Sequence, residues 1–366
     1  MRRIVCLMMV LLMVSAVYPT LAENAGTAGQ QKLPALRLAY RKLFPFGTSV
    51  TYTEAINTKR MAFYISQFNI LTPGNELKPD SVLDIPECKR LSARDDTAVA
   101  VHFDAARPMM IYAQASKTPV HGHVLVWHQQ TPEAFFHERY DVSRPLVTRK
   151  VMLKRLENYI KAVVTGLEEK YPGVIVSWDV VNEAVEDGKH TLRPSRWTEV
   201  IGNDFVVRAF EYARKYAPEG VRLFYNDYNT AYEPKQSGIV GLLKALQKAG
   251  TCDGYGFQMH HEIRQPGYPA IEKAFRRIAA LGLRLRISEL DVGIPEKTED
   301  NLEAQAKLYG QIMRLAVEFA DQVDAVQVWG VTDDLSWRTG QNPLLFNSDF
   351  SPKPAFYAVV EAADQK

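Results

Sequence analysis

Two glutamates stand at the ends of apolar runs, where ionisable residues are unusual. Glu183 closes the run Trp178–Glu183, and Glu289 lies in the run Arg286–Asp291. An ionised acid beside apolar residues is costly unless it has a partner or a function. Cleavage of a glycosidic bond needs two such groups, one protonated carboxyl to assist the leaving oxygen and one carboxylate to attack the anomeric carbon. Together the two glutamates indicate glycoside hydrolysis, whereas either one alone would also fit a structural ion pair.

An alternation of short and long segments predicts the elements that carry these glutamates. Eight apolar, β-rich runs are each followed by a longer segment with the helical spacing of apolar residues. This pattern favours an α/β fold, a (β/α)8 barrel with loop insertions. The predicted strands are Pro45–Val50, Phe68–Thr72, Pro119–Trp127, Val174–Asn182, Val221–Asn226, Gly254–His260, Leu283–Leu290 and Val323–Gly330. The predicted helices are Glu54–Gln67, Val99–Ser116, Leu146–Glu169, Asp204–Tyr216, Lys235–Lys248, Tyr268–Leu281, Leu302–Phe319 and Pro354–Ala363.

An open doubly wound sheet would show the same alternation of strands and helices. That fold carries a Gly-rich phosphate loop after its first strand, and the run Gly47–Val50 does not resemble one. No linker rich in Gly, Pro or Ser divides the chain. We therefore expect residues 23–366 to form a single TIM-barrel catalytic domain.

The first residues have the features of an export signal. Arg2 and Arg3 give a basic start, residues 4–18 are almost continuously apolar, and Thr20–Ala22 offers a small-residue cleavage site. The apolar stretch is shorter than the roughly 20 residues that a membrane-spanning helix needs, although an uncleaved anchor is the alternative. We predict a cleaved signal peptide over residues 1–22 and a secreted or periplasmic mature protein.

The mature chain is electrically neutral. The 366-residue sequence has 44 basic and 42 acidic residues, and removing residues 1–22, which contain two arginines and no acid, leaves 42 of each. Binding to nucleic acid or to an anionic membrane would need a basic surplus, so neither partner is expected. Cys88 and Cys252 would lie in an oxidising compartment. Whether they pair stays open, because a disulfide needs Cα atoms within about 7 Å.

Six ordered motifs fall at the predicted carboxyl ends of strands three to eight, where this fold carries its catalytic groups. They resemble, in order, the strand-end motifs of family 10 glycoside hydrolases, which are mainly endo-β-1,4-xylanases. The likeness covers roughly residues 33–362. The motifs are His121–His128, Trp178–Glu183, Tyr225–Asn229, Gly256–His260, Ile287–Asp291 and Trp329–Asp333.

The resemblance implies a reaction and a substrate. Glu183 would be the general acid/base and Glu289 the nucleophile of a retaining double displacement, with carboxyl groups about 5 to 5.5 Å apart. Asn182 would bind the 2-hydroxyl of the attacked sugar. The protein would then hydrolyse internal bonds of xylan and xylo-oligosaccharides as a monomer, with no metal and no organic cofactor.

Further residues receive supporting roles from the same resemblance. Gln258 would support the acid/base, and His260, oriented by Asp291, would keep the nucleophile ionised. Outside these roles, Trp178 is expected in the core and Asp179 in a structural ion pair. The sugar-binding residues that the resemblance implies are Asn75, Lys78, His123, Trp127, Gln130, Trp329 and Trp337 on the glycone side, and Tyr228 beside the cleavage point.

Other classes of function fit parts of the same pattern. His121 and His123 have the spacing of a barrel metallohydrolase site, which would need further His, Lys and Asp ligands at later strand ends. A carbohydrate-binding barrel without catalysis would not need both glutamates. A β-1,4-glucanase or mannanase of a related barrel family is the nearest competitor.

One position departs from the family pattern. Related xylanases commonly have a glutamate just before the asparagine that corresponds to Asn75, and here that position is Gly74. Losing a charge-assisted hydrogen bond should weaken the second glycone-side subsite by roughly 1.5 to 3 kcal/mol. We therefore predict weak activity on short substrates, unless the loop Pro79–Thr97, which also reads as a surface insertion, replaces the carboxylate.

Overall fold

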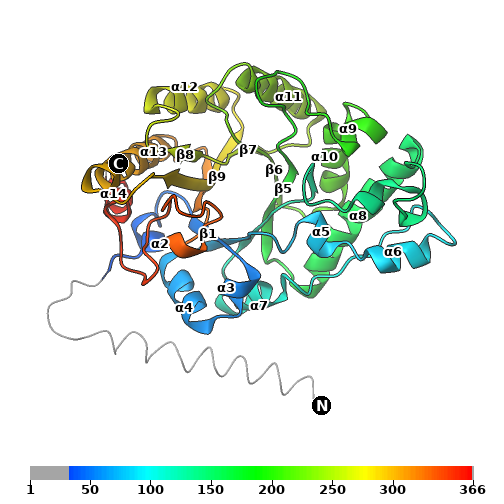
Figure 1. The fold of residues 1–366 in the computed structure, drawn as a ribbon, viewed down its shortest axis with the longest axis horizontal. Coiled ribbons are helices and arrows are strands. Elements are labelled where there is room, and N and C mark those ends of the chain that lie inside the picture. Colours follow the sequence, from blue (N-terminus) through cyan, green and yellow to red (C-terminus); the bar gives the residue numbers. More distant parts are fainter. Residues whose placement is uncertain (1–32, 365–366) are drawn as a thin grey trace, which may run out of the picture.

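The computed structural model describes residues 33–364, and its centre is a closed barrel of parallel strands (Figure 1). Around the barrel the strands follow the order β1, β2, β3, β5, β6, β7, β9 and β10, and β10 pairs with both β9 and β1 to close it. This confirms the predicted (β/α)8 barrel. The strands are β1 Phe46–Val50, β2 Ile70–Pro73, β3 Val120–Gly122, β4 Val126–Trp127, β5 Ile175–Asn182, β6 Arg222–Asp227, β7 Gly254–Phe257, β8 His260–Glu262, β9 Arg284–Gly293 and β10 Val323–Val328.

Two predicted strands are each divided in two. The run Pro119–Trp127 contains β3 and β4, both of which pair with β5. The run Gly254–His260 contains β7 and only the first residue of β8, because Met259 has a positive φ of 58° that interrupts the extended backbone. In both places the division lies at the carboxyl end of the barrel and next to residues with predicted roles.

Helices surround the barrel (Figure 1), and most lie within a few residues of their predicted ranges. The predicted helix Glu54–Gln67 is two helices, and Val99–Ser116 is wrong over residues 99–106. That helix begins only at Arg107, with Pro108 in its first turn, while Val101 pairs antiparallel with Leu83. The α-helices are α2 Leu36–Ala39, α3 Tyr52–Ala55, α4 Thr58–Gln67, α5 Pro79–Val82, α6 Ile85–Leu91, α7 Arg107–Ser116, α8 Arg149–Lys170, α9 Arg196–Val200, α10 Phe205–Tyr216, α11 Lys235–Ala249, α12 Tyr268–Ala279, α13 Glu299–Glu318 and α14 Pro354–Ala362.

Trp178 fills the barrel wall between β3 and β5. It is 1% exposed, and a Cβ atom at Gly122 would lie 2.3 Å from its ring, so only glycine fits beside it. The prediction that Trp178 is a core residue is confirmed. The two strands are thereby held at close range just below the site residues that follow them.

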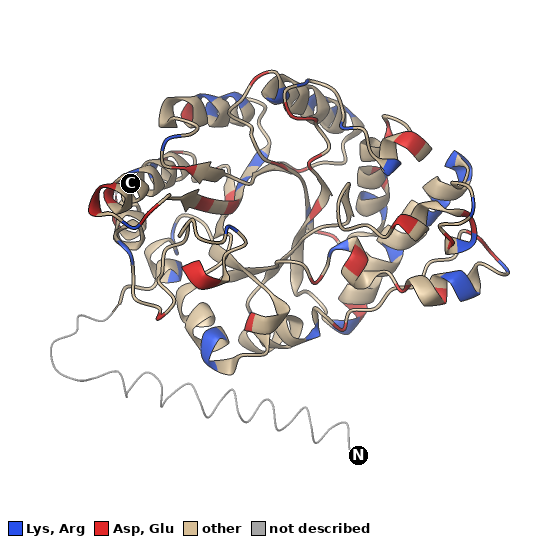
Figure 2. Cartoon of the chain, viewed as in Figure 1, with Lys and Arg blue, Asp and Glu red and all other residues tan. Residues whose placement is uncertain are grey.

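Basic and acidic residues are interspersed over the outer helices (Figure 2), in keeping with the nearly balanced composition of 44 basic and 42 acidic residues. Cys88 and Cys252 are both free thiols. Within residues 33–364, no helix is long and apolar enough to cross a membrane. The predicted signal peptide, residues 1–22, lies outside the described residues.

Candidate active site

Glu289 lies in β9, near the carboxyl end of the barrel, and is almost completely buried. Its side chain is 6% exposed. One carboxylate oxygen accepts a hydrogen bond from Asn226 Nδ2 at 2.7 Å, and the other lies 3.2 Å from His260 Nε2. Both partners therefore hold the carboxylate in one orientation.

Glu183 directly follows β5 and adopts a left-handed backbone conformation with φ 56°. Trp127 Nε1 donates to its Oε2 at 2.9 Å. Gln258 Nε2 donates to Oε1 at 2.9 Å. Unlike Glu289, Glu183 is only partly buried and has no cation in hydrogen-bonding contact with its carboxyl group. All three side-chain donors to its carboxyl group are therefore neutral.

Two amides connect the glutamates. Asn182 donates through Nδ2 to Glu183 at 3.2 Å, and its Oδ1 accepts from Asn226 Nδ2 at 3.0 Å. The same Asn226 nitrogen donates to Glu289. Gln258 also donates to Asn182 Oδ1, at 3.0 Å. A continuous hydrogen-bonded chain therefore joins the two carboxyl groups across β5, β6 and β9.

His260 is held between two carboxylates. Its Nδ1 lies 2.8 Å from Asp291 Oδ2, and its Nε2 faces Glu289. Burial alone would lower the pKa of His260, but the charges and hydrogen bonds of Asp291 and Glu289 outweigh burial and raise it to about 10. At neutral pH the imidazolium therefore supplies a positive charge directly beside Glu289.

Asp291 also fixes an aromatic side chain. Trp337 Nε1 donates to Asp291 at 3.0 Å, and Arg338 donates to its other oxygen at 2.8 Å. The Trp337 ring packs against the His260 ring with centroids 4.9 Å apart, yet the residue is 61% exposed. An exposed indole that is fixed at one edge can serve as a binding platform.

A second group of predicted residues forms what we call the Lys78 cluster, made of Asn75, Lys78, Trp127 and Gln130. Lys78 Nζ donates to Asn75 Oδ1 and to Gln130 Oε1, both at 2.9 Å, and lies 4.9 Å from the Trp127 ring centroid. Burial lowers the pKa of Lys78, with the carboxylates of Glu289 and other acids opposing the shift. Its direct partners are neutral, so the ammonium keeps hydrogen-bonding capacity for a ligand.

His123 and Trp329 lie deeper in the barrel mouth. His123 is buried, its Nδ1 lies 2.9 Å from Asp179 Oδ2, and its ring meets the Trp329 ring edge-on with centroids 5.3 Å apart. Asp179 also lies 3.0 Å from His121 Nε2. Burial lowers the pKa of His121 to about 4, so at neutral pH this contact joins Asp179 to an uncharged imidazole, and the structural ion pair stays a prediction. Among residues 33–364, no group of three or more His, Cys, Asp or Glu side chains could hold a metal ion.

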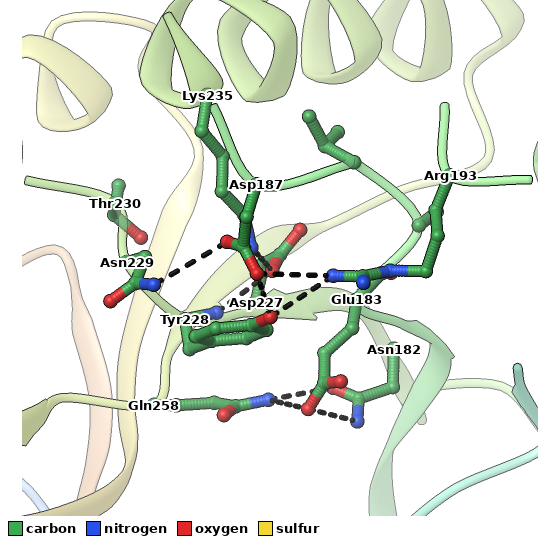
Figure 3. A network of polar contacts seen from close by, with 12 residues as sticks. Asn182, Glu183, Asp187, Arg193, Asp227, Tyr228, Asn229, Thr230, Lys235 and Gln258 are labelled. Carbon is green, nitrogen blue, oxygen red and sulfur yellow. Dashed lines mark hydrogen bonds and ion pairs between the residues drawn. The ribbon is translucent and has the colours of Figure 1, made fainter. Parts of the chain in front are cut away.

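Tyr228 lies on the other side of Glu183, in a group that we call the Lys235 cluster (Figure 3). The cluster consists of Asp187, Arg193, Asp227, Tyr228 and Lys235. The Tyr228 hydroxyl donates to Asp187 and accepts from Arg193 at 3.0 Å. Arg193 Nε also donates to the backbone oxygen of Glu183 at 3.3 Å. The cluster is therefore attached directly to the backbone that carries Glu183.

Sequence reasoning missed part of this arrangement. The sequence marks Asn226 and Asp227 only as polar residues at a strand end, and no pattern distinguishes Asp187, Arg193 or Lys235. Asp187 and Arg193 occupy an irregular connection after β5, where no periodic pattern marks a residue. Lys235 is the first residue of α11, and its pattern predicts only a helix start. The Tyr225–Asn229 motif was the one signal that could have identified Asn226.

Gly74 has no side chain, but two neighbouring acids contact the Lys78 cluster. Glu76 is buried and accepts from the backbone nitrogens of Tyr52 at 2.5 Å and Asn75 at 2.8 Å. Asp80, in the loop Pro79–Thr97, accepts from Gln130 Nε2 at 3.4 Å. The same loop contains α5 and α6 and is also tied to the outer surface, with Lys89 at 2.9 Å from Asp141. That this loop replaces the missing carboxylate stays a prediction.

Comparison with known proteins gives a consistent result. The family model described as glycosyl hydrolase family 10 matches residues 35–362. The bifunctional endo-1,4-beta-xylanase XylA of Ruminococcus flavefaciens is 35% identical over 334 residues, covering 90% of this chain and 34% of that protein. Exoglucanase XynX of Acetivibrio thermocellus is 33% identical over 339 residues, covering 91% of this chain and 30% of that protein.

Solved structures agree on the fold. A mutant of TsXylA, an intracellular xylanase of Thermoanaerobacterium saccharolyticum, in complex with xylotriose has a TM-score of 0.81 and 33% identity, covering 90% of this chain and 99% of that one. The chain spans only 31% to 53% of the length of four similar curated relatives. What those longer proteins do as a whole is therefore not carried over directly.

Proposed function

The chain belongs to glycosyl hydrolase family 10, and on that premise we propose that it is an endo-1,4-β-xylanase that cleaves xylan with retention of anomeric configuration. The observation that carries this proposal is the pair Glu183, directly after β5, and Glu289, in β9, which are joined through Asn182 and Asn226. One carboxyl is fixed beside a protonated histidine, and the other is held by neutral donors. That division suits a nucleophile and an acid/base, respectively.

The reaction then runs in two steps. A Glu289 oxygen attacks the anomeric carbon while Glu183 transfers its proton to the leaving oxygen, which breaks the glycosidic bond and forms a glycosyl ester. Glu183 next takes a proton from water as that water attacks the same carbon, which releases Glu289. His260, aligned by Asp291, keeps Glu289 ionised between turnovers. Asn182 donates to the 2-hydroxyl, and Gln258 steadies Glu183 through both steps.

The Lys78 cluster and three aromatic residues would bind the glycone side. Lys78, Asn75 and Gln130 present donors and acceptors to sugar hydroxyls, with Trp127 beside them. Trp329 and Trp337 would pack against the sugar rings, with His123 behind Trp329. Tyr228 would contact the sugar on the leaving side.

A β-1,4-glucanase is the second candidate, because one relative of similar identity is named an exoglucanase. We favour xylan because Lys78, Trp329 and Trp337 would close around the positions where glucose carries a hydroxymethyl group, which xylose lacks. Incubation with xylan, carboxymethyl cellulose and mannan, with products resolved by length, tests the choice. Xylan should yield a range of oligosaccharides at once, and cellulose cleaved as fast as xylan would refute the substrate assignment.

We also propose that the protein acts outside the cytoplasm, on the strength of the basic and apolar pattern of residues 1–22. Amino-terminal sequencing of the mature protein should begin after Ala22. A mature protein that still starts at Met1 would contradict export by cleavage.

A further inference from the structure

Lys235 carries a positive charge into the protein beside the proposed catalytic residues. Its side chain is 1% exposed, and Nζ lies 2.9 Å from both Asp187 Oδ1 and Asp227 Oδ1. The ammonium also lies 3.5 Å from the Tyr228 ring centroid (Figure 3). Burying a charge in this way is costly, and replacing a whole buried ion pair by apolar side chains of similar volume is often neutral or stabilising. A buried ion pair is therefore weak evidence of a stabilising role alone.

One arm of the cluster leads from Lys235 to the backbone after Glu183. Asp227 accepts from the Tyr225 hydroxyl, and that hydroxyl accepts from the backbone nitrogens of Ala184 at 3.0 Å and Val185 at 3.2 Å. These are the two residues after Glu183, whose left-handed φ is unfavourable for a residue with a side chain. Burial raises the pKa of Asp227 to about 6, and Lys235 opposes that shift. Lys235 thus favours the ionised form of Asp227.

A second arm leads from Lys235 to the leaving side of Glu183. Asp187 accepts from both Lys235 Nζ and the Tyr228 hydroxyl, and the Tyr228 backbone nitrogen donates to Asp227 Oδ1 at 2.9 Å. Arg193 then connects Tyr228 to the backbone oxygen of Glu183. The Tyr228 ring is thereby fixed by the ammonium on one face and by two charged groups at its hydroxyl.

We propose that Lys235 is a positioning residue for proton delivery, which aligns Glu183 with the leaving oxygen through the Asp227–Tyr225 arm and holds Tyr228 beside the departing sugar through Asp187. The inference rests on the proposed function, because it assigns Lys235 to the leaving-group half of glycoside cleavage. Lys235 touches no reacting atom. Its loss should therefore matter most when the leaving group needs a proton.

A series of aryl β-xylobiosides with leaving groups of graded acidity tests this assignment. Lys235→Met removes the charge and keeps the chain length. We expect kcat/KM to fall about 10- to 100-fold on xylan and on phenyl xylobioside, within the range that general acid catalysis supplies. Dinitrophenyl xylobioside releases dinitrophenolate, which leaves without a proton. On this substrate kcat/KM, which reports the bond-breaking step, should change less than about threefold. Lys235→Arg should recover part of the loss, because it restores the positive charge.

Lys353 offers a matched control. It is another buried lysine, 2% exposed, which contacts a buried aspartate, Asp333, at 3.1 Å in the connection between β10 and α14. Lys353→Met should lower the melting temperature without changing how kcat/KM depends on leaving-group acidity. An equal loss on every substrate for Lys235→Met, matching Lys353→Met, would overturn the proposal.

A second variant covers the case in which Lys235→Met does not fold. Tyr225→Phe cuts only the arm from Asp227 to the backbone after Glu183 and leaves Lys235 in place. Tyr225→Phe should steepen the dependence of kcat/KM on leaving-group acidity. A dependence equal to that of the unsubstituted enzyme would also overturn the proposal. Failure of the proposed function is distinct, because the unsubstituted enzyme would then cleave neither xylan nor any xylobioside.

Discussion

Two buried lysines flank Glu183, and they differ in what surrounds their charge. Lys78 is 7% exposed, and its hydrogen-bond partners are the neutral amides of Asn75 and Gln130, with the Trp127 ring nearby. Lys235 is 1% exposed and lies between the carboxylates of Asp187 and Asp227. Both clusters also contact Glu183, one through Trp127 and the other through Arg193.

The difference separates binding from positioning. A buried ammonium that meets only neutral acceptors gains from a further polar partner, so Lys78 is suited to bind substrate hydroxyls. An ammonium between two carboxylates is already satisfied, so Lys235 is suited to hold the residues around it. Substitution of Lys78 should therefore lower activity on all leaving groups alike, whereas substitution of Lys235 should lower it mainly on poor leaving groups.

The largest losses should come from the two glutamates, which both clusters serve. Glu289→Ala should lower kcat by about 10⁴-fold or more on every substrate while substrate binding remains, because it removes the nucleophile. Glu183→Ala should lower kcat on xylan by about 10²- to 10⁴-fold. On aryl substrates with good leaving groups its kcat should fall much less, and added azide should restore turnover there. Steady-state kinetics with both substrate types checks the pair, and uniform losses in Glu183→Ala would contradict its role.

Loss of the Lys78 charge should act on the glycone side alone. Lys78→Met removes hydrogen bonds to the sugar, so kcat/KM should fall about 10- to 100-fold, corresponding to about 1.5 to 3 kcal/mol. Because every xylobioside uses this side, the loss should be the same for good and poor leaving groups. A loss confined to poor leaving groups would mean that Lys78 and Lys235 do not differ as proposed.

His260, which lies beside the nucleophile Glu289, should make the stability of the protein depend on pH. Its pKa is raised from the ordinary 6.5 to about 10 in the folded state. The resulting stabilisation is fully present below about pH 6.5 and is lost as the pH rises through about 10. The difference in melting temperature between the enzyme and His260→Asn should therefore shrink between about pH 6 and about pH 11. A difference that stays constant over that interval would contradict the charged imidazolium.

A carboxylate introduced at Gly74, beside the Lys78 cluster, should give the smallest effect, which is a gain in activity on short substrates. A Cβ atom there would lie 3.3 Å from Thr51 Cγ2, a close contact that a small side-chain adjustment can relieve. Gly74→Glu should raise kcat/KM on xylotriose by about threefold to tenfold, less than the full worth of a charge-assisted hydrogen bond, and change xylan hydrolysis little. No gain on xylotriose, together with good activity of the native enzyme on it, would show that this subsite is intact by other means.

The sequence predicted the barrel and marked the two glutamates, but not the charged members of the Lys235 cluster, for a physical reason. The glutamates stand in apolar strand runs, where the period of the strand marks them as exceptions, whereas Asn75, Lys78 and Trp127 are implied only by the resemblance to family 10. Lys235 begins a helix, and Asp187 and Arg193 lie in an irregular connection, so nothing local distinguishes them from surface charges. The helix expected from Val99 failed similarly, because the pairing of Val101 with Leu83 is a long-range contact.

The central claim is that Glu289 attacks the anomeric carbon and that Glu183 supplies and then removes a proton. Proton NMR during the first minutes of hydrolysis of xylohexaose tests it most directly, because the anomers formed first have not yet interconverted. The β-anomer should appear first and the α-anomer only later, by mutarotation. The α-anomer as the first product would contradict the double displacement and the roles assigned to both glutamates.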